Sequence, residues 1–290
     1  MKRVGIISKP EKPELHAIIP ELIGWLEERS FKVLIDPVSS VYLGKDTSRT
    51  VGVAGREAIA AQSPEFVIVL GGDGTLLAAA RAVAKAGIPI LAVNLGSLGF
   101  LTEVRLEDLY PALQEWMAGA LAPEDRTMIH CELYRDGRVI AEYDALNDVV
   151  VAKGAIARVA DLRISVDRLL VAEYRADGVI VASPTGSTAY SLAAGGPVLA
   201  PNVRAIVITP ISPHALTNRP LVVPEGSQIV VEPLRVPDQA FLTVDGQEAI
   251  PMNERDQVRC SLSQARVRLV RKNDPGFFDA LREKLKWGER

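Results

Sequence analysis

The sequence predicts an α/β domain followed by a mostly β domain. Up to about residue 125, short apolar runs alternate with segments of helical periodicity. Beyond that point, short strands of alternating polarity follow one another with almost no helical pattern between them. From Pro275 onward the tail is again typical of a helix. We therefore expect domains at 1–125 and 126–270, and a helix within 271–290 that packs back on the first domain.

The first part repeats a strand–helix pattern. Its apolar runs predict strands at Val4–Ser8, Phe31–Asp36, Phe66–Leu70 and Ile88–Asn94. Helices are predicted after Pro13 and at Leu76–Ala86 and Leu106–Ala118. Pro20 should kink the first helix or delay its start, and Gly87 should end the second. Strands that alternate with helices favour a parallel sheet covered on both faces.

The second part is built from hairpins. Asp136-Gly137 separates two alternating runs, Ile129–Tyr134 and Arg138–Asp144, which is a strong hairpin signal. Further strands are predicted at Asp148–Ala152, Leu162–Val166, Leu170–Arg175, Val179–Ala182, Ala205–Thr209, Gln228–Glu232, Ala240–Val244 and Ala265–Arg271. A short helical pattern follows Thr188.

Composition excludes several classes of protein. The formal net charge of −3 gives no general attraction for nucleic acid or an anionic membrane. Any phosphate must therefore be held locally, by loops and a few placed cations. Cys131 and Cys260 are far apart, which favours reduced, buried thiols over a disulfide framework, and no spacing supports a zinc or iron site. With no signal peptide and no stretch of membrane-spanning length, we expect a cytoplasmic protein.

The sharpest motif is Gly71-Gly72-Asp73-Gly74-Thr75, set between a predicted strand and a predicted helix. Glycines let the backbone approach a ligand closely, and the N-terminus of the following helix suits phosphate. A carboxylate in such a loop would repel a bound phosphate, unless it binds a metal ion or accepts a proton. The alternative is an ordinary joint in which Asp73 or Thr75 caps the helix. Neither a P-loop nor a strict GxGxxG pattern occurs.

Two other motifs suit a nucleotide. Small and hydroxylated residues dominate Pro184–Pro197, shortly after Tyr174–Gly178, so a flat polar ligand could lie close to the backbone there. Asn147-Asp148 at a strand start could hold a ribose diol, with the carboxylate accepting both hydroxyl protons. Alone, the first motif could equally be an ordinary loop, whereas the Asn-Asp pair would more readily be a turn or strand-start device.

Taken together, these motifs resemble the NAD kinase family. The matching segments, in the family's order, are Gly71–Thr75, Leu95–Glu103 (LGSLGFLTE), Asn147-Asp148, Arg175–Gly178 (RADG), Ser183–Pro197 and Ile208–Leu216 (ITPISPHAL). The resemblance as a whole spans about residues 66 to 250. Lipid kinases and phosphofructokinases carry loops similar to GGDGT, whereas the Ser183–Pro197 run together with the Asn-Asp pair is far more specific.

The resemblance implies a Rossmann-like N-terminal domain, a β-sandwich-like C-terminal domain, and homodimers or homotetramers. By position, Asp73 corresponds to the proton acceptor, and Asn147 and Asp148 to the ribose-holding pair. The remaining nucleotide-site positions are Gly71, Gly72, Gly74, Thr75, Arg158, Arg175, Asp177, Thr188, Ala189, Tyr190, Ser191, Leu192, Ala193 and Gln247. Asp148 stands where many relatives have Glu, and Ser183 where Thr is commoner.

The implied reaction moves the γ-phosphate of ATP to the 2′-hydroxyl of the adenosine ribose of NAD, forming NADP. Mg²⁺ would be carried by the ATP phosphates and not by a protein site. Two alternatives remain, a lipid or sugar kinase with the same loop and a non-catalytic NADP(H)-binding sensor. The sequence shows neither an acyl channel nor a cationic sugar-phosphate pocket, and the intact loop disfavours a sensor. The sequence does not distinguish ATP from polyphosphate, or NAD from NADH.

Overall fold

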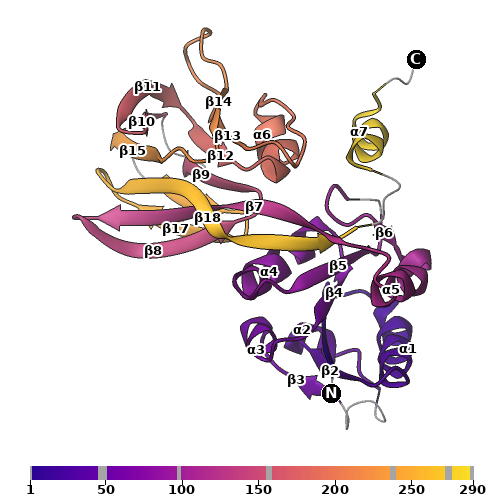
Figure 1. Ribbon diagram of the computed structural model, residues 1–290. Coiled ribbons are helices and arrows are strands. Elements are labelled where there is room, and N and C mark those ends of the chain that lie inside the picture. The colour runs from indigo at the N-terminus through magenta and orange to yellow at the C-terminus, as the bar shows by residue number, and fades with distance from the viewer. Residues whose placement is uncertain are drawn as a thin grey trace. The chain divides into compact units, whose positions relative to one another are not determined.

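The computed structural model describes residues 2–44, 51–96, 99–154, 159–235, 240–271 and 276–287. It divides into two compact units (Figure 1). The first combines Met1–Asp125 with Val267–Arg290, and the second is Arg126–Arg266. Strands β7 (Pro123–Arg135) and β18 (Gln257–Val270) each contain one of the boundaries.

The first unit is built on a parallel sheet. Its strands are β1 (Lys2–Ser8), β2 (Phe31–Ile35), β3 (Gly52–Val53), β4 (Phe66–Gly71), β5 (Pro89–Asn94) and β6 (Val104–Arg105). The order β3-β2-β1-β4-β5 is parallel throughout, and the end of β18 adds to β5 in the same direction. Strand β4 is buried along its whole length, as expected for a strand covered on both faces.

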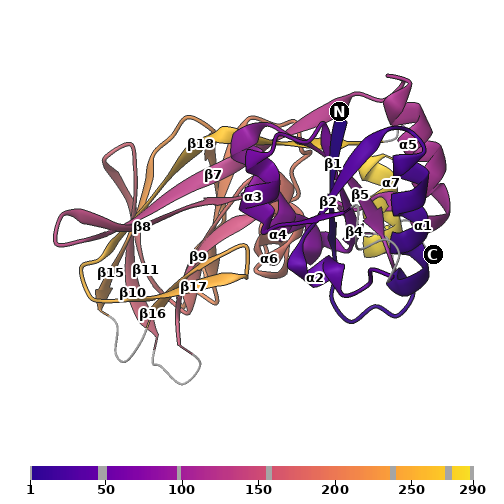
Figure 2. The same ribbon diagram turned by 90° about the horizontal axis from the view of Figure 1, so that it is seen from below.

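Helices cover both faces of this sheet (Figure 2). The helices of this unit are α1 (Leu15–Glu27), α2 (Pro37–Ser40), α3 (Arg56–Ala61), α4 (Asp73–Val83), α5 (Leu109–Met117) and α7 (Phe277–Leu285), with 3-10 turns at Ala84–Ala86 and Leu106–Asp108. Helices α1 and α5 pack into one core with the strands, whereas α3 and α4 lie on the opposite face. The predicted covered parallel sheet is therefore confirmed.

Two of the local predictions concern where helices begin and end. Gly87 ends the α4 segment in the left-handed conformation, with φ of 64°, as predicted. The expectation that Pro20 delays the first helix is wrong, because α1 begins at Leu15 and encloses Pro20. Burial of Leu15, Ile19 and Leu22 offsets the hydrogen bond that the proline cannot donate. Helix α3 was not predicted, because six residues carry little periodicity.

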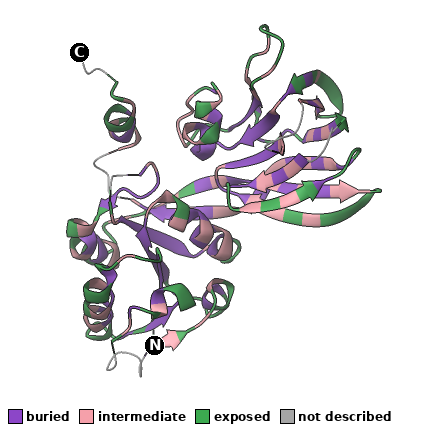
Figure 3. Cartoon of the chain, turned by 180° about the vertical axis from the view of Figure 1, so that it is seen from behind, coloured by how far each residue is buried: buried purple, intermediate pink, exposed green. Residues whose placement is uncertain are grey.

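The second unit is a two-sheet β structure. Besides β7 and β18, its strands are β8 (Arg138–Ala145), β9 (Asp148–Lys153), β10 (Ala160–Val166), β11 (Leu169–Ala176), β12 (Gly178–Ala182), β13 (Ala205–Ile211), β14 (Leu221–Pro224), β15 (Ile229–Arg235), β16 (Ala240–Val244) and β17 (Glu248–Met252). One sheet holds β11-β10-β15-β18 with β7 and β8, and the other runs β14-β13-β12-β9-β16-β17. Strand residues of both sheets share one core, which makes the unit sandwich-like (Figure 3).

The hairpin and cysteine predictions hold in this unit. Arg135 pairs with Arg138 across Asp136-Gly137, and both turn residues have positive φ, which matches the favoured hairpin turn. Cys131 and Cys260 are free and fully buried. The predicted helix after Thr188 is short, η4 (Thr185–Thr188) followed by α6 (Tyr190–Ala193). Within the described ranges, no helix is both long and apolar enough to cross a bilayer.

Candidate functional site

The GGDGT segment lies at the carboxyl end of β4, as the sequence predicted. Strand β4 ends at Gly71, Gly72 is the N-cap residue, and α4 begins at Asp73 with no side chain capping it. A Cβ atom on Gly71 would lie 2.5 Å from Thr75 Oγ1, so only glycine allows this tight turn. The first turn of α4 thus presents backbone N–H groups and a positive dipole end at the sheet edge where ligands bind in α/β folds.

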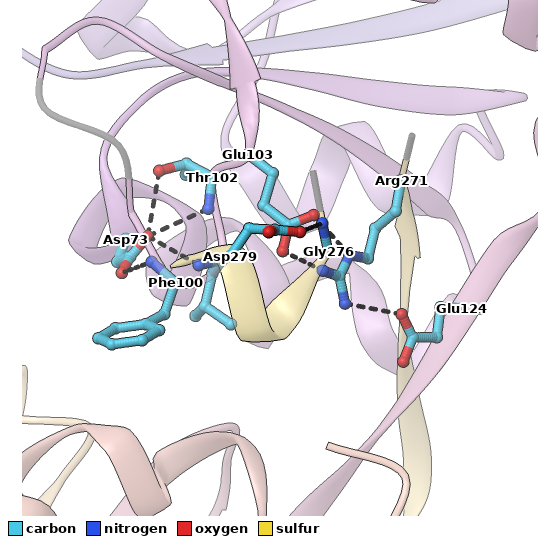
Figure 4. Close-up of polar contacts among 9 residues, drawn as sticks. Asp73, Phe100, Thr102, Glu103, Glu124, Arg271, Gly276 and Asp279 are labelled. Atoms are coloured by element: carbon cyan, nitrogen blue, oxygen red, sulfur yellow. Dashed lines mark hydrogen bonds and ion pairs between the residues drawn. The ribbon is translucent and has the colours of Figure 1, made fainter. Parts of the chain in front are cut away.

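The Asp73 carboxylate does not cap its own helix. It accepts hydrogen bonds from the backbone N–H groups of Phe100 (3.0 Å), Leu101 (3.2 Å) and Thr102 (3.1 Å), and from Thr102 Oγ1 (3.1 Å) (Figure 4). Oδ1 takes three of these bonds and Oδ2 one. The capping interpretation of Asp73 is therefore wrong. Thr75 does not cap the helix either, because it lies inside α4.

The partner of Asp73 is the end of the Leu95–Glu103 motif. Gly71 and Asn94 pair in register at the ends of β4 and β5, so the two motifs start side by side. A Cβ atom on Gly99 would lie 2.0 Å from Asp73 Oδ1, which requires glycine at that position. Asn94 Nδ2 donates to the Thr102 carbonyl at 3.4 Å and fixes the start of the turn to its end. Ser97 and Leu98 lie outside the described residues.

A cavity of about 320 Å³ opens beside the same loop. Its lining residues are Ser8, Lys9, Pro10, Arg56, Gly72, Gly74, Thr75 and Ala78. The cavity is thus lined by two cations, Lys9 and Arg56, by the N-terminus of α4 and by the hydroxyl group of Thr75. This combination suits an anion. The sequence analysis expected a few placed cations but did not identify these, because β1 and α3 bring Lys9 and Arg56 together from distant positions.

Hydrogen bonds to Asp36 and Ser39 hold the cavity-lining residues Arg56 and Ser8 in place. Arg56 Nε donates to Asp36 Oδ2 at 2.9 Å, and the Asp36 carboxylate is only 1% exposed. Asp36 Oδ1 accepts from the Ser39 backbone N–H at 2.9 Å, and Ser39 Oγ accepts from the Ser8 N–H at 2.7 Å. Ser8 Oγ itself is buried without a hydrogen-bond partner among the described residues. A buried donor of this kind normally has a partner, which a bound ligand would supply.

The second unit contains a cavity of about 370 Å³ built from the other predicted motifs. It is lined by Asn147, Asp148, Val150, Ala152, Ala189, Tyr190, Thr243, Asp245 and Gly246. The structure thus brings the Asn-Asp pair and part of the Thr188–Ala193 run together. Gly186 allows this approach, because a Cβ atom there would lie 2.0 Å from the Asn147 carbonyl oxygen.

Asp245 organises the Asn-Asp pair and was missed by the sequence analysis. Its carboxylate accepts from the backbone N–H groups of Leu146 (3.1 Å), Asn147 (2.7 Å) and Asp148 (3.2 Å). It follows β16, which pairs with β9, so the sheet fixes Asp245 beside the start of β9. The sequence offers no signal for this role beyond the Asp-Gly dipeptide, which favours a turn.

Asp148 is a buried acid beside another acid. Burial, and secondarily the negative charge of Asp245, raise the pKa of Asp148 to about 7. The ionised form of Asp148 is therefore destabilised until hydrogen-bond donors reach it. A ribose diol in this cavity would provide two such donors.

The remaining predicted residues are more dispersed. Ser191 Oγ is buried 2.8 Å from Thr209 Oγ1, which gives Ser191 a structural hydrogen bond. Asp177 pairs with Lys153 at 3.2 Å, and Arg175 is exposed on β11. Gln247 lies in the β16–β17 turn, and Thr188, Leu192 and Ala193 surround Tyr190 on η4 and α6. None of Arg175, Asp177 and Gln247, all described, lines the cavity. Arg158 lies outside the described residues.

The β7–β8 hairpin carries a group of potential metal ligands that the chain spacing did not indicate. Among the described residues, ligand atoms of His130, Glu132 and Glu142 lie within 4.8 Å of one another. Glu142 pairs with Glu132 from the neighbouring strand, which is why their spacing along the sequence gave no signal. His130 Nδ1 lies 3.1 Å from Asp144 Oδ1, and the chemistry proposed below does not use this group.

Comparison with known proteins shows similarity along nearly the whole chain. Residues 4–121 match the family model of the ATP-NAD kinase N-terminal domain, and residues 146–272 that of the ATP-NAD kinase C-terminal domain. The NAD kinases of Acidobacterium capsulatum and Koribacter versatilis are each 54% identical to this chain, and each alignment covers all of both proteins.

Two solved structures are similar in fold. Yeast NADH kinase, in a complex with NADH, is 28% identical with a TM-score of 0.90, covering 100% of this chain and 89% of that one. An NAD kinase from Archaeoglobus fulgidus, in a complex with ATP, is 24% identical with a TM-score of 0.76, covering 98% of each chain. The second likeness concerns the fold alone.

Replacing Asp148 with Asn should stabilise the protein at high pH. The folded state of the wild type binds a proton on Asp148 between about pH 4 and 7, where the unfolded state does not. Its stability therefore falls as pH rises through this window, and the loss is complete above pH 7. Asp148→Asn removes the penalty, so its Tm should exceed the wild-type Tm by roughly 10 °C at pH 8.5 and match it near pH 4. A difference in Tm that is independent of pH would contradict the raised pKa.

Proposed function

Because the chain belongs to the ATP-NAD kinase family, we propose that it transfers the γ-phosphate of ATP to the 2′-hydroxyl of the adenosine ribose of NAD, with Asp73 accepting the hydroxyl proton. The observation that carries the overall reaction is the match of both family models on one chain that covers its NAD kinase relatives end to end. These relatives do not favour the lipid-kinase, sugar-kinase or sensor alternatives.

The donor phosphates are proposed to bind in the cavity beside α4. Lys9, Arg56 and the first turn of α4 supply positive charge, and the buried Ser8 hydroxyl supplies a donor that lacks a partner. Phosphoryl transfer depends chiefly on positioning and charge neutralisation, which this arrangement supports. Asp73 is the carboxylate of the GGDGT loop itself, and backbone N–H donors already bond both of its oxygens. We therefore expect Mg²⁺ to be held by the ATP phosphates, where it would offset their negative charge.

A ribose of NAD is proposed to bind at Asn147 and Asp148. Two ribose hydroxyl groups would stabilise the ionised form of Asp148, so NAD binding near pH 7 should release a proton. The neighbouring Asp245 bonds hold the backbone of this pair in place before the ligand arrives, which lowers the entropy lost on binding. The same Asp148→Asn variant should therefore raise the KM for NAD while it gains stability.

The proposed proton transfer uses Asp73 Oδ2. Of the four hydrogen bonds at this carboxylate, Oδ1 accepts three and Oδ2 accepts one. Each carboxylate oxygen offers about two lone-pair sites, so Oδ2, which accepts one hydrogen bond, retains a site that can accept the 2′-hydroxyl proton. The turn that occupies Oδ1 also orients the carboxylate, which matters because an ordinary Asp is a weak base toward an alcohol.

Four finer properties follow the family resemblance. We propose a cytoplasmic enzyme, in keeping with two free, buried cysteines, and a homodimer or homotetramer. NAD is the proposed acceptor, and NADH is the competitor to test, since a relative of 28% identity is described as an NADH kinase. ATP is the proposed donor in preference to polyphosphate.

The direct test is an assay of product formation with purified protein. ATP, MgCl₂ and NAD should yield NADP, with little product from diacylglycerol or fructose 6-phosphate and a lower rate with NADH or polyphosphate. Formation of NADP that requires a divalent cation would support the proposal. Tight NADP binding without turnover would instead indicate the sensor alternative.

Asp73→Asn should lower kcat by roughly 10²–10⁴. The amide cannot accept the hydroxyl proton, and its NH₂ group would oppose the Phe100 N–H. Because this change also disturbs the turn, Thr102→Val serves as the control, since it removes one donor from Oδ1 and keeps the carboxylate. Thr102→Val should lower kcat less than about tenfold, and NADP affinity should survive in both variants. Near-normal turnover in Asp73→Asn would remove Asp73 from the mechanism.

Lys9→Gln should raise the KM for ATP roughly two- to fivefold without changing the KM for NAD. The variant removes one exposed cation from the proposed phosphate cavity, and one exposed charge contributes about 1 kcal/mol or less. Arg56 is a poorer target, because its loss would leave the buried Asp36 carboxylate unpaired. Lys2→Gln, at an exposed ion pair with Glu65, is the matched control. Equal changes for both substrates, or in both variants, would exclude this placement of the phosphates.

A further inference from the structure

Residues 99–102 form the turn that binds Asp73, and the residue that follows this turn, Glu103, is bound by Arg271. The Glu103 carboxylate accepts from Arg271 Nε at 2.7 Å and from Arg271 Nη2, an arrangement in which one guanidinium grips both carboxylate oxygens. Arg271 Nη1 also donates to Glu124 Oε2 at 2.8 Å (Figure 4). Thr102 is fully buried and Glu103 nearly so, which leaves this end of the turn little freedom.

Arg271 is fixed by the strand that precedes it. It follows directly after Val270, which pairs with Leu91 in the centre of β5. The other end of the turn is tied to the last residue of β5 through Asn94 and the Thr102 carbonyl. The donors that orient Asp73 therefore lie between two anchors on neighbouring parallel strands, β5 and β18.

The two carboxylates on Arg271 differ in environment. The side chains of Arg271 and Glu103 are 13% and 7% exposed, whereas that of Glu124 is 41% exposed. A desolvated ion pair with two parallel hydrogen bonds defines both the distance between its two side chains and their relative orientation. Loss of one partner leaves a buried charge unpaired. An exposed pair constrains its partners much less.

We propose that Arg271 is a positioning residue for Asp73, acting through the buried Glu103 carboxylate to fix the N–H groups of Phe100, Leu101 and Thr102. This inference rests on the role proposed for Asp73 above. The two-pronged grip is the essential feature, because it sets the rotation of the turn as well as its position. A lysine would keep the charge but lose this geometry.

The competing explanation is that Arg271 only secures the end of β18. In that case its loss would lower stability and the fraction of active protein, without changing the turn or the rate per active site. Glu103 and Glu124 separate the two explanations, since both contact the same guanidinium and only Glu103 belongs to the turn.

The experiment compares Glu103→Gln, Arg271→Lys and the matched control Glu124→Gln. Amide hydrogen exchange is measured in peptides covering residues 99–103 and β4, and kcat and KM are measured per NADP-binding site. We expect faster exchange at 99–103 in Glu103→Gln and Arg271→Lys, with β4 unchanged. Their kcat per site should fall roughly 10- to 100-fold, as for a small misplacement of a reacting group, with KM values within about twofold of wild type. Glu124→Gln should resemble wild type in both measurements.

Unchanged exchange at 99–103 in Glu103→Gln and Arg271→Lys would overturn the proposal, as would a kcat per site within about twofold of wild type. Full recovery of both measurements in Arg271→Lys would overturn the claim that the two-pronged geometry matters. Failure of the proposed function is distinguishable, because exchange reports the turn without any turnover. If Asp73→Asn is active while exchange at 99–103 responds as expected, Asp73 loses its role and the Arg271 contact remains.

Discussion

The carboxylate of Asp73 is the point on which the first unit's site depends. A charged side chain that is partly buried requires several donors, and here three consecutive backbone N–H groups and one hydroxyl supply them. This requirement joins two motifs that the sequence presents separately, Gly71–Thr75 and Leu95–Glu103. It also explains why Gly99 has no side chain, since a Cβ atom would occupy the space of the carboxylate. The paired register of Gly71 and Asn94 makes the junction possible.

The second unit uses the same device at a different place. Asp245 accepts three consecutive N–H groups at residues 146–148, just as Asp73 does at 100–102. In both units an aspartate from one segment fixes the backbone of another, so each loop is shaped before a ligand binds. The second case carries an energetic penalty, because Asp245 places a charge beside the buried Asp148 and contributes to its raised pKa. Functional sites commonly retain such a conflict when the ligand relieves it.

Sequence reasoning succeeded where the signal is local. The buried strand before Gly71, the hairpin at Asp136-Gly137 and the helix end at Gly87 each depend on a few neighbouring residues, and all three occur as predicted. It failed where a partner lies far along the chain. A capping role stayed open as the alternative for Asp73 because its donors lie about 28 residues later, and Asp245 is nearly 100 residues from the backbone it holds. The prediction that Pro20 delays the first helix failed for another reason. Tertiary burial of α1 outweighs the local helix-breaking tendency of proline.

A chain with a net charge of −3 must still bind polyanionic nucleotides, and the internal pairing of its acids makes this possible. Asp73 and Asp245 are each surrounded by backbone N–H dipoles, Asp36 is paired with Arg56, and Glu103 with Arg271. Each of these negative charges is stabilised within a few ångströms and so projects less repulsion toward an approaching phosphate. Lys9 and the N-terminus of α4, by contrast, face a cavity beside the GGDGT loop. The local field at the loop is thus set by which charges are paired, and the net charge of the chain is a poor guide to it.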